Sequence, residues 1–436
     1  VELHIDDPSL RFDYYCWDVY STMAAYYAAN PEAQQWRRDT LHAIEKHEGD
    51  TFEFASTIAR AIVKRHIATM LRLGITYDLL PKESDIIALH FWDRAFELLK
   101  ASGAVIQETE GKHKDCWVMK LDESAEFEGM NEPDKILVRS NGTVTYTGKD
   151  IAYQLWTFGL LDRTFNFRKF STYDDGHILW ETTSGDGDSN APRFGGAQKV
   201  VNVIDVRQSY LQKVVKEGVR QLGHVREAEN SIHYSYEMVA LTPATAKALG
   251  IEVSEEDSKK PYIEMSGRKG LGVKADDLIE ALQSKAAESV REGSKREGLS
   301  EDGIEQLGRE ISVAALRYFM LKYGRNKVIA FDFNEALTFE GDSGPYLQYS
   351  TVRVENIFRK MIERSVESTL DTNSLDALTL NEEHTDQMWE LVRLRSPLTY
   401  AILRPPAALA LHLTPPTRFL TAPRFPPFTP TRPIPH

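Results

Sequence analysis

The sequence predicts an α/β fold followed by an all-helical region. The stretch "KVVNVIDV" (199–206) is a near-continuous apolar run, typical of a parallel strand that is buried on both faces. A helical pattern follows at 209–223, and the next strand is predicted at 232–241. Strand–helix–strand alternation of this kind indicates a parallel sheet with crossover helices. From 275 to 323 the pattern is helical and highly charged, and 344–369 opens one more long helix.

The N-terminal part of the chain, residues 10–73, is predicted to be mainly helical. Apolar residues recur there at helical spacing, and Gly74 is a natural helix stop. Basic residues occupy the other side of the same helix, and we interpret them as a solvated face in preference to an RNA-binding surface. The apolar positions are Phe54, Ile58, Ile62 and Ile67, and the basic positions are Arg60, Lys64, Arg65 and Arg72.

Shorter elements are predicted between these two regions. The strands are 75–81, 116–121 and 135–148, the helices are 85–103 and 149–161, and a glycine- and serine-rich surface loop is 181–198. Asn141 and Gly142 form the strongest short hairpin signal, so the third strand segment should turn there. Thr147 or Gly148 should lie near the N-cap of the helix that follows.

Composition limits the classes of protein that fit. The chain has 52 Lys and Arg against 65 Asp and Glu, a net charge of −13, so nucleic-acid binding would have to rest on local basic patches. Its two cysteines, Cys16 and Cys116, lie far apart, which indicates a reducing cytoplasm. The sequence has neither an apolar run of about 20 residues nor a signal-peptide profile at its start, which predicts no membrane attachment. We expect a cytoplasmic monomer.

The composition changes after Glu390. The segment 397–436 holds 11 of the 19 prolines, and such a density of proline cannot continue a helical bundle. We expect this segment to be disordered. It reads either as a proline-rich recognition tail or as out-of-frame sequence, and the abrupt change favours the second hypothesis.

The loop "EMSGRKG" (264–270) has a composition suited to phosphate groups. Its glycines allow close approach of the backbone, and Arg268 and Lys269 can offset charge that develops on a departing pyrophosphate. A solvated surface loop explains the same composition equally well. The position after a strand and before a helix favours the ligand role, because ligands of open α/β sheets gather at that edge.

Here the sequence resembles a family. "EMSGRKG" looks like a degenerate form of the KMSKS signature of class I aminoacyl-tRNA synthetases, as arginyl-tRNA synthetases carry it. The stretches 137–158, 202–215 and 339–357 resemble, in order, the family's arginine-holding segment, its next strand and helix, and its entry into the anticodon-binding bundle. The resemblance covers the first 395 residues.

The resemblance implies a domain order. A Rossmann-type catalytic domain would occupy 1–260, with a helical insertion at about 20–130, and the signature loop with stem-contacting helices would occupy 261–335. The anticodon-binding helical domain would begin at 336–396. Implied substrates and cofactors are arginine, tRNA(Arg), ATP and Mg²⁺, with arginyl-adenylate formed first and the arginyl group then transferred to the tRNA.

The resemblance also assigns residues. Tyr146, Asp150 and Gln208 would hold the arginine side chain. Asp205 and Met238 would lie against the ribose and adenine of ATP. The mobile, catalytic ATP loop would contain Met265, Ser266, Arg268 and Lys269, and the tRNA would contact Tyr346, Gln348, Tyr349 and Arg353. No metal-ligating set is implied.

The arginine assignment has independent support and an alternative. Tyr146 and Asp150 are four residues apart, so they share a helix face, and a carboxylate there can make a two-pronged pair with a guanidinium. Alternatively, Asp150 is a first-turn carboxylate stabilised by the helix dipole and Tyr146 a strand-end aromatic.

One family feature does not occur in the sequence. The resemblance would place a His-Ile-Gly-His signature on the first strand–helix crossover, and the chain contains none. We therefore expect a fragment that is cut at both ends, poorly stable and weakly active or inactive by itself. The alternative is a non-catalytic remnant that binds tRNA or a partner. A related enzyme for another amino acid fits the residues less well.

Overall fold

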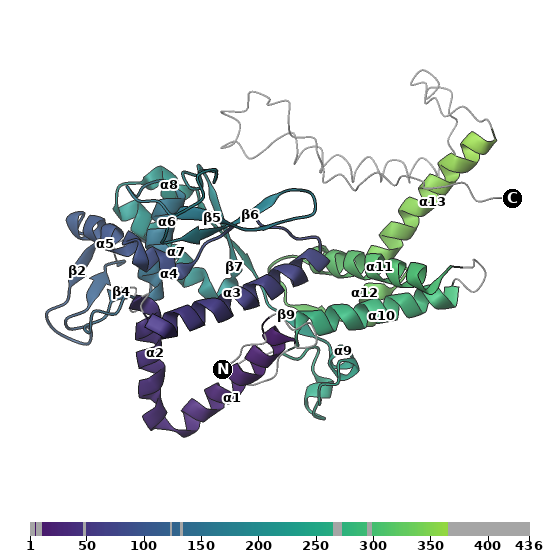
Figure 1. The fold of residues 1–436 in the computed structure, drawn as a ribbon, viewed down its shortest axis with the longest axis horizontal. Coiled ribbons are helices and arrows are strands. Elements are labelled where there is room, and N and C mark those ends of the chain that lie inside the picture. The colour runs from purple at the N-terminus through teal and green to yellow at the C-terminus, as the bar shows by residue number, and fades with distance from the viewer. Residues whose placement is uncertain are drawn as a thin grey trace, which may run out of the picture. The chain divides into compact units, whose positions relative to one another are not determined.

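Figure 1 draws the chain as a ribbon. The computed structural model describes residues 5, 11–46, 49–122, 124–130, 134–264, 273–293 and 299–364. The chain divides into two compact units, Val1–Arg353 and Val354–His436, and all that follows concerns the first, apart from the end of its last helix. The helices are α1 (Phe12–Ala29), α2 (Gln34–Lys46), α3 (Gly49–Arg72), α4 (Glu83–Ala88), α5 (Phe91–Ala101), α6 (Tyr146–Thr157), α7 (Ser209–Gln221), α8 (Val225–Glu229), α9 (Pro243–Ala248), α10 (Ala275–Gly293), α11 (Glu301–Lys322), α12 (Phe333–Leu337) and α13 (Gly344–Glu363).

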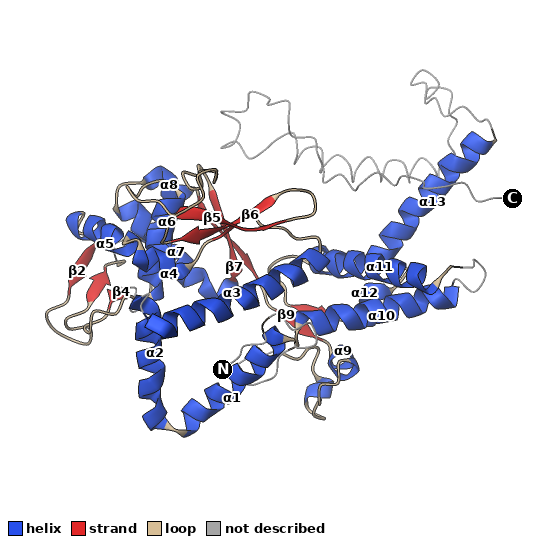
Figure 2. Cartoon of the chain, in the orientation of Figure 1, coloured by secondary structure: helices blue, strands red, loops and turns tan. Residues whose placement is uncertain are grey.

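The strands form small sheets of two or three members (Figure 2). They are β1 (Leu79–Leu80), β2 (Val105–Gln107), β3 (Trp117–Met119), β4 (Lys135–Val138), β5 (Asn166–Thr172), β6 (Ile178–Thr183), β7 (Val200–Asp205), β8 (Ser231–Tyr236), β9 (Val239–Leu241) and β10 (Ile329–Phe331). The described strands pair in the orders β1-β6-β5, β2-β3-β4, β7-β8 and β10-β9. The mixed α/β class is confirmed.

The predicted strand–helix–strand unit is confirmed as β7, α7 and β8. The two strands pair in parallel along their whole length, from Val200 with Ser231 to Asp205 with Tyr236. The prediction that the first strand is buried on both faces is wrong. Val201 and Val203 are 51% and 62% exposed, so that face of the two-stranded sheet is open at these positions. On the neighbouring strand the Arg325 guanidinium lies 4.7 Å from the centroid of the Tyr234 ring.

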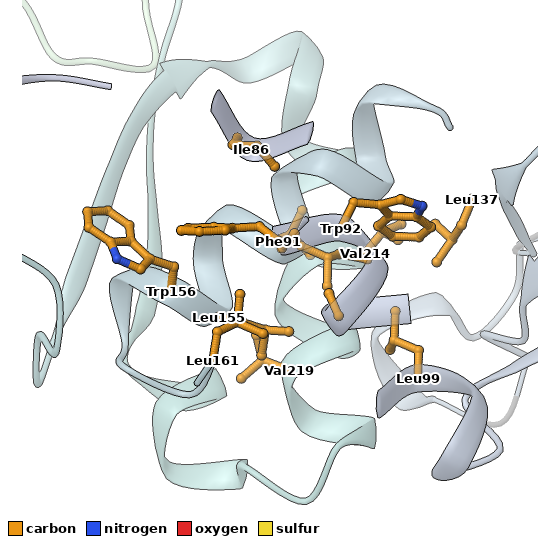
Figure 3. Close-up of a cluster of buried hydrophobic side chains, with 14 of the residues drawn as sticks. Ile86, Phe91, Trp92, Leu99, Leu137, Leu155, Trp156, Leu161, Val214 and Val219 are labelled. Atoms are coloured by element: carbon orange, nitrogen blue, oxygen red, sulfur yellow. The ribbon is translucent and has the colours of Figure 1, made fainter. Parts of the chain in front are cut away.

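The largest hydrophobic core lies among α5, α6 and α7, and Figure 3 draws its central residues. Phe91 of α5 and Trp156 of α6 both contact the ring of Phe165, at centroid distances of 4.3 and 4.7 Å. Because both helices pack against the same aromatic ring, the last turn of α6 is held against α5. A second core joins α10 and α11 to β9, β10 and α12.

Other predictions about elements are partly wrong. The helix predicted at 85–103 is two helices, α4 and α5, because His90 takes a left-handed conformation with φ of 57° between them. The strand predicted at 232–241 is also divided: β9 leaves β8 and pairs with β10. The loop predicted at 181–198 begins inside β6, where Glu181 is buried. The hairpin turn at Gly142, with φ of 82°, is confirmed.

Helix α3 ends at Arg72, and Gly74 follows in a left-handed conformation, as predicted. The interpretation of its basic side as purely solvated is wrong at two positions. Arg60 pairs with Glu181 of β6, and Arg72 pairs with Asp276 of α10. Phe54, predicted on the apolar side, is 49% exposed. The helix therefore uses part of its charged side to fasten itself to other elements.

Candidate functional site

Helix α6 positions two of the predicted site residues. Its N-cap is Thr145, two or three residues earlier than predicted, so Tyr146 is the first helical residue and is 73% exposed. Gly148, in the first turn, is buried against Trp92 of α5, where a β-carbon would lie 2.8 Å from the indole ring. A larger residue would displace α6, so this glycine sets the position of the helix start.

Asp150, one turn after Tyr146, is an unpaired carboxylate. It forms no hydrogen bond or ion pair with any residue that the structure describes, although Lys149 beside it pairs with Glu83 at 3.0 Å. Asp150 is exposed, but protein atoms around its carboxyl displace part of its water and raise the pKa of Asp150 to about 6; repulsion from Glu83 adds to this, and Lys149 opposes it. A carboxylate in this state gains stability from a cationic ligand.

The end of β7 positions two further predicted residues. Asp205 caps the short 3₁₀ helix Val206–Gln208 by accepting a hydrogen bond from the backbone N–H of Arg207 at 2.8 Å. The Arg207 guanidinium also donates to both Asp205 oxygens, and these bonds lower the pKa of Asp205 to about 2. Gln208 is exposed at the start of α7.

A buried amide links α6 to the parallel strands. Gln154 of α6 donates from Nε2 to the Ser231 hydroxyl at 3.1 Å, and the Asn202 amide of β7 approaches its Oε1 at 3.5 Å. Gln154 is 4% exposed. Between the described residues, no direct hydrogen bond or ion pair joins Tyr146 or Asp150 to Asp205 or Gln208. The link through Gln154 was not predicted from the sequence. The only sequence signal for it is a polar residue among the apolar positions Ile151 and Leu155 of the same helix.

The remaining residues assigned to ATP binding follow β8 in the sequence. Met238 is half-buried between β8 and β9, and its carbonyl accepts a hydrogen bond from Ile329. Met265, Ser266, Arg268 and Lys269 lie outside the described residues. The structure resumes at Val273, just before α10 begins.

Helix α13 carries the predicted tRNA contacts on its first turns. Tyr346 and Tyr349 are 45% and 51% exposed, and Arg353 is exposed. Gln348 lies on the same helix, but its Oε1 is buried without a hydrogen-bond partner among the described residues. Two of the four side chains therefore present large aromatic surfaces to solvent.

The described residues contain no group of three or more His, Cys, Asp or Glu residues that could hold a metal ion. None of their helices has the length and apolar character needed to cross a membrane.

Comparison with known proteins identifies relatives. No family model matches the sequence. The chain is 37% identical over 355 residues to the arginine–tRNA ligase of Pyrococcus abyssi, which is 81% of this chain and 52% of that protein. It is 35% identical over 348 residues to the enzyme of Thermococcus kodakarensis, with 79% and 50% covered, and 34% identical over 333 residues to that of Deinococcus radiodurans, with 76% and 50% covered.

The solved structures agree with the sequence comparison. The arginyl-tRNA synthetase of Thermus thermophilus superposes with a TM-score of 0.62 at 31% identity, covering 78% of this chain and 51% of that structure. The chain thus spans about half the length of the curated relatives it matches. Similarity over four fifths of its residues, in both sequence and fold, supports one conclusion: the chain belongs to the arginyl-tRNA synthetase family.

Proposed function

We propose that this chain carries part of the arginine- and ATP-binding machinery of an arginine–tRNA ligase, which activates arginine as arginyl-adenylate and transfers it to tRNA(Arg). The observation that carries the proposal is the unpaired Asp150 carboxylate on α6. No described cation forms an ion pair with it, although the charge of neighbouring Lys149 partly offsets its own, and the relatives of the chain are arginine–tRNA ligases.

In this proposal Asp150 receives the guanidinium of arginine. Two parallel N–H···O bonds to a carboxylate match a planar guanidinium, whereas a lysine ammonium can supply only a point charge. Tyr146, exposed one helical turn earlier, would cover the same group with its ring, in place of the Lys149 ammonium that lies 5.7 Å from the ring centroid. Gln208, at the start of α7, completes the polar set. Gln154 joins α6, which carries Tyr146 and Asp150, to β7 and β8, which precede and follow α7.

ATP would lie beyond the ends of β7 and β8. Asp205 and Met238 would contact the ribose and adenine of ATP. Its phosphates would be contacted by Met265, Ser266, Arg268 and Lys269. Because the described residues hold no metal-ligating group, they fit Mg²⁺ only as an ion carried by the ATP phosphates. The adenylation step needs positioning and charge stabilisation and no side-chain nucleophile.

The tRNA would contact α13. Exposed Tyr346 and Tyr349 offer flat surfaces for unpaired bases, and Arg353 offers a guanidinium for a phosphate. A Rossmann-type domain followed by an anticodon-binding helical domain is the arrangement proposed for the whole protein.

The test is arginine binding by the purified chain, measured by calorimetry, together with tRNA-dependent arginine–ATP/pyrophosphate exchange. We expect arginine to bind, lysine to bind at least about tenfold more weakly, and Asp150→Asn to weaken arginine binding by at least about tenfold. Equal affinity of the wild type and Asp150→Asn for arginine would refute the assignment. Exchange activity that Asp150→Asn removes would extend the proposal from binding to catalysis.

A further inference from the structure

A cavity separate from Asp150 is lined by residues of α1, α3 and the start of α10. Figure 1 labels these three helices. Its volume is about 530 Å³, and flat rings make up much of its wall: Tyr14 and Trp17 of α1, His66 of α3 and Tyr77 before β1. Lys274, just before α10, contributes a cation. An apolar cavity with a few convergent polar groups is the usual form of a ligand site.

The walls of this cavity are fastened together by charged groups. Asp276 of α10 accepts hydrogen bonds from Arg11 at 2.8 Å, from Arg72 and from the Thr69 hydroxyl at 2.9 Å. The Tyr14 hydroxyl donates to Asp277 at 2.6 Å. Segments more than 200 residues apart in the sequence are therefore joined at one point, so the cavity is formed before any ligand arrives.

Of the four rings in the wall, Tyr14 already stacks against cations, whereas the polar atoms of the other three make no hydrogen bond with the described residues. Arg11 and Lys274 each lie 4.0 Å from the centroid of the Tyr14 ring, so this ring already has cationic partners. Among the described residues, the Trp17 indole nitrogen, the His66 ring and the Tyr77 hydroxyl have no hydrogen-bond partner. Trp17 is half-buried, with part of its surface open to solvent. Flat surfaces with free polar edges suit an unstacked nucleobase.

Charge at the cavity is mixed. Lys274 lines it together with Asp276 and Asp13, and Asp13 Oδ1 is buried with no hydrogen-bond partner among the described residues, so it can accept from the amino group of a base. The half-buried Lys274 ammonium lies 3.8 Å from the exposed Asp18 carboxylate, which a phosphate can replace. The Asp276 carboxylate is neutralised by Arg11 and Arg72, so it does not repel an anion strongly. His66 and Lys64 extend the exposed polar surface of α3 beside the cavity.

We propose that this cavity binds a single unstacked nucleobase of an RNA strand, with Trp17 as its stacking surface and Lys274 facing the adjoining phosphate. The inference rests on the proposed function in one respect: tRNA is the RNA that such a chain would meet. It adds a contact site separate from the exposed aromatic residues of α13.

The test measures binding of a fluorescently labelled single-stranded RNA, ACCA, to the purified chain by anisotropy. Trp17→Ala should weaken binding about tenfold, because stacking on an aromatic side chain contributes on the order of 1–3 kcal/mol per base. Trp17→Phe should retain most of the affinity. The matched control is Trp36→Ala on α2, an indole that is 61% exposed and does not line the cavity; it should bind as the wild type does.

A photochemical experiment keeps the inference testable if Trp17→Ala fails to fold. ACCU carrying 5-iodouracil in place of the last base is irradiated with the wild-type chain, and the crosslinked peptide is identified by mass spectrometry. Crosslinks to Trp17, His66 or Tyr77 support the site. Crosslinks elsewhere only, absence of RNA binding, or equal affinity of Trp17→Ala and Trp36→Ala would overturn it.

The two proposals fail separately. If Asp150→Asn leaves arginine binding unchanged while Trp17→Ala weakens RNA binding, the arginine assignment is wrong and the cavity is an RNA site. If arginine binding depends on Asp150 but RNA binding is indifferent to Trp17, the proposed function stands and the nucleobase site is wrong.

Discussion

The unpaired carboxylate of Asp150 has a pKa raised to about 6, so its charge changes within the pH range in which most proteins stay folded. If this charge binds the guanidinium of arginine, lowering the pH below about 6 protonates the site and weakens the affinity by up to about tenfold per pH unit. Calorimetry between about pH 5 and pH 8 should show this loss. Asp150→Asn should bind weakly at every pH, and a parallel pH profile in both proteins would contradict the prediction.

The same pKa also affects folding. Because the folded state raises the pKa of Asp150 above its ordinary value of 3.8, it binds this proton more tightly than the unfolded state does. The free energy of unfolding therefore falls as the pH rises from about 4 to about 6, and the charged group destabilises the fold above that range. Asp150→Asn should raise the melting temperature near pH 7.5, and the difference should shrink toward pH 4. A difference that does not change with pH would contradict the assigned pKa.

Glu181 is a buried carboxylate with three cationic neighbours. Arg168 donates to it at 2.8 Å, Arg60 also donates, and the Lys82 ammonium lies at 3.6 Å. Burial alone would raise the pKa of Glu181, but the hydrogen bonds from Arg60 and Arg168 together outweigh burial and lower it. Its contribution to stability is therefore present above the ordinary pKa of 4.5 and is lost as the pH falls further.

Glu181→Gln should lower the free energy of unfolding by about 3 kcal/mol near pH 7, because it leaves two guanidinium groups at a partly buried site without their anion. Urea unfolding followed by circular dichroism measures the loss. Glu53→Gln is the matched control: Glu53 of α3 and Glu181 line one cavity beside β6, but Glu53 is exposed and unpaired among the described residues. Equal stability of both variants would show that the cluster contributes nothing.

At the scale of elements, α10 and α11 approach closely at one glycine. A β-carbon on Gly308 would lie 2.8 Å from the β-carbon of Ala287, whereas one on Gly303, in the first turn of α11, would meet only the Ser300 hydroxyl at 3.4 Å. Gly308→Ala should destabilise the chain by about 1–3 kcal/mol by forcing the helices apart. Gly303→Ala should instead stabilise it by up to about 1 kcal/mol, as alanine does in helices. Thermal unfolding of the pair distinguishes packing from helix propensity; a stabilising Gly308→Ala would disprove the close approach.

The elements that the sequence analysis located correctly depend on local signals. The turn at Gly142 and the end of α3 at Gly74 require left-handed backbone that glycine supplies. The break at His90 was missed because apolar periodicity continues through it and only the backbone conformation changes. Arg60 and Arg72 were misread because their partners, Glu181 and Asp276, lie more than 100 residues away in the sequence. The assignment of Asp150 to arginine binding rests on family resemblance and stays a prediction, since Asp150 alone fits an ordinary first-turn carboxylate.

At the scale of the whole molecule, the parallel pair β7–β8 has one helix-covered face and one apolar open face. The register places Val201 beside Ile232 and Val203 beside Tyr234 on that open face. These four side chains are 51%, 37%, 62% and 48% exposed. Parallel sheets are stable when both faces are covered, and a two-stranded sheet is marginal in water.

The purified chain should therefore unfold with a broad, low-temperature transition and bind the apolar dye ANS before it unfolds. The double variant Val201→Thr/Val203→Thr should reduce dye binding and leave the melting temperature within a few degrees, because neither valine is buried. The matched control is Val214→Thr on α7, a fully buried valine whose change should cost about 1–3 kcal/mol and increase dye binding. A sharp transition at an ordinary mesophile temperature without dye binding would mean that other parts of the chain cover this face in solution.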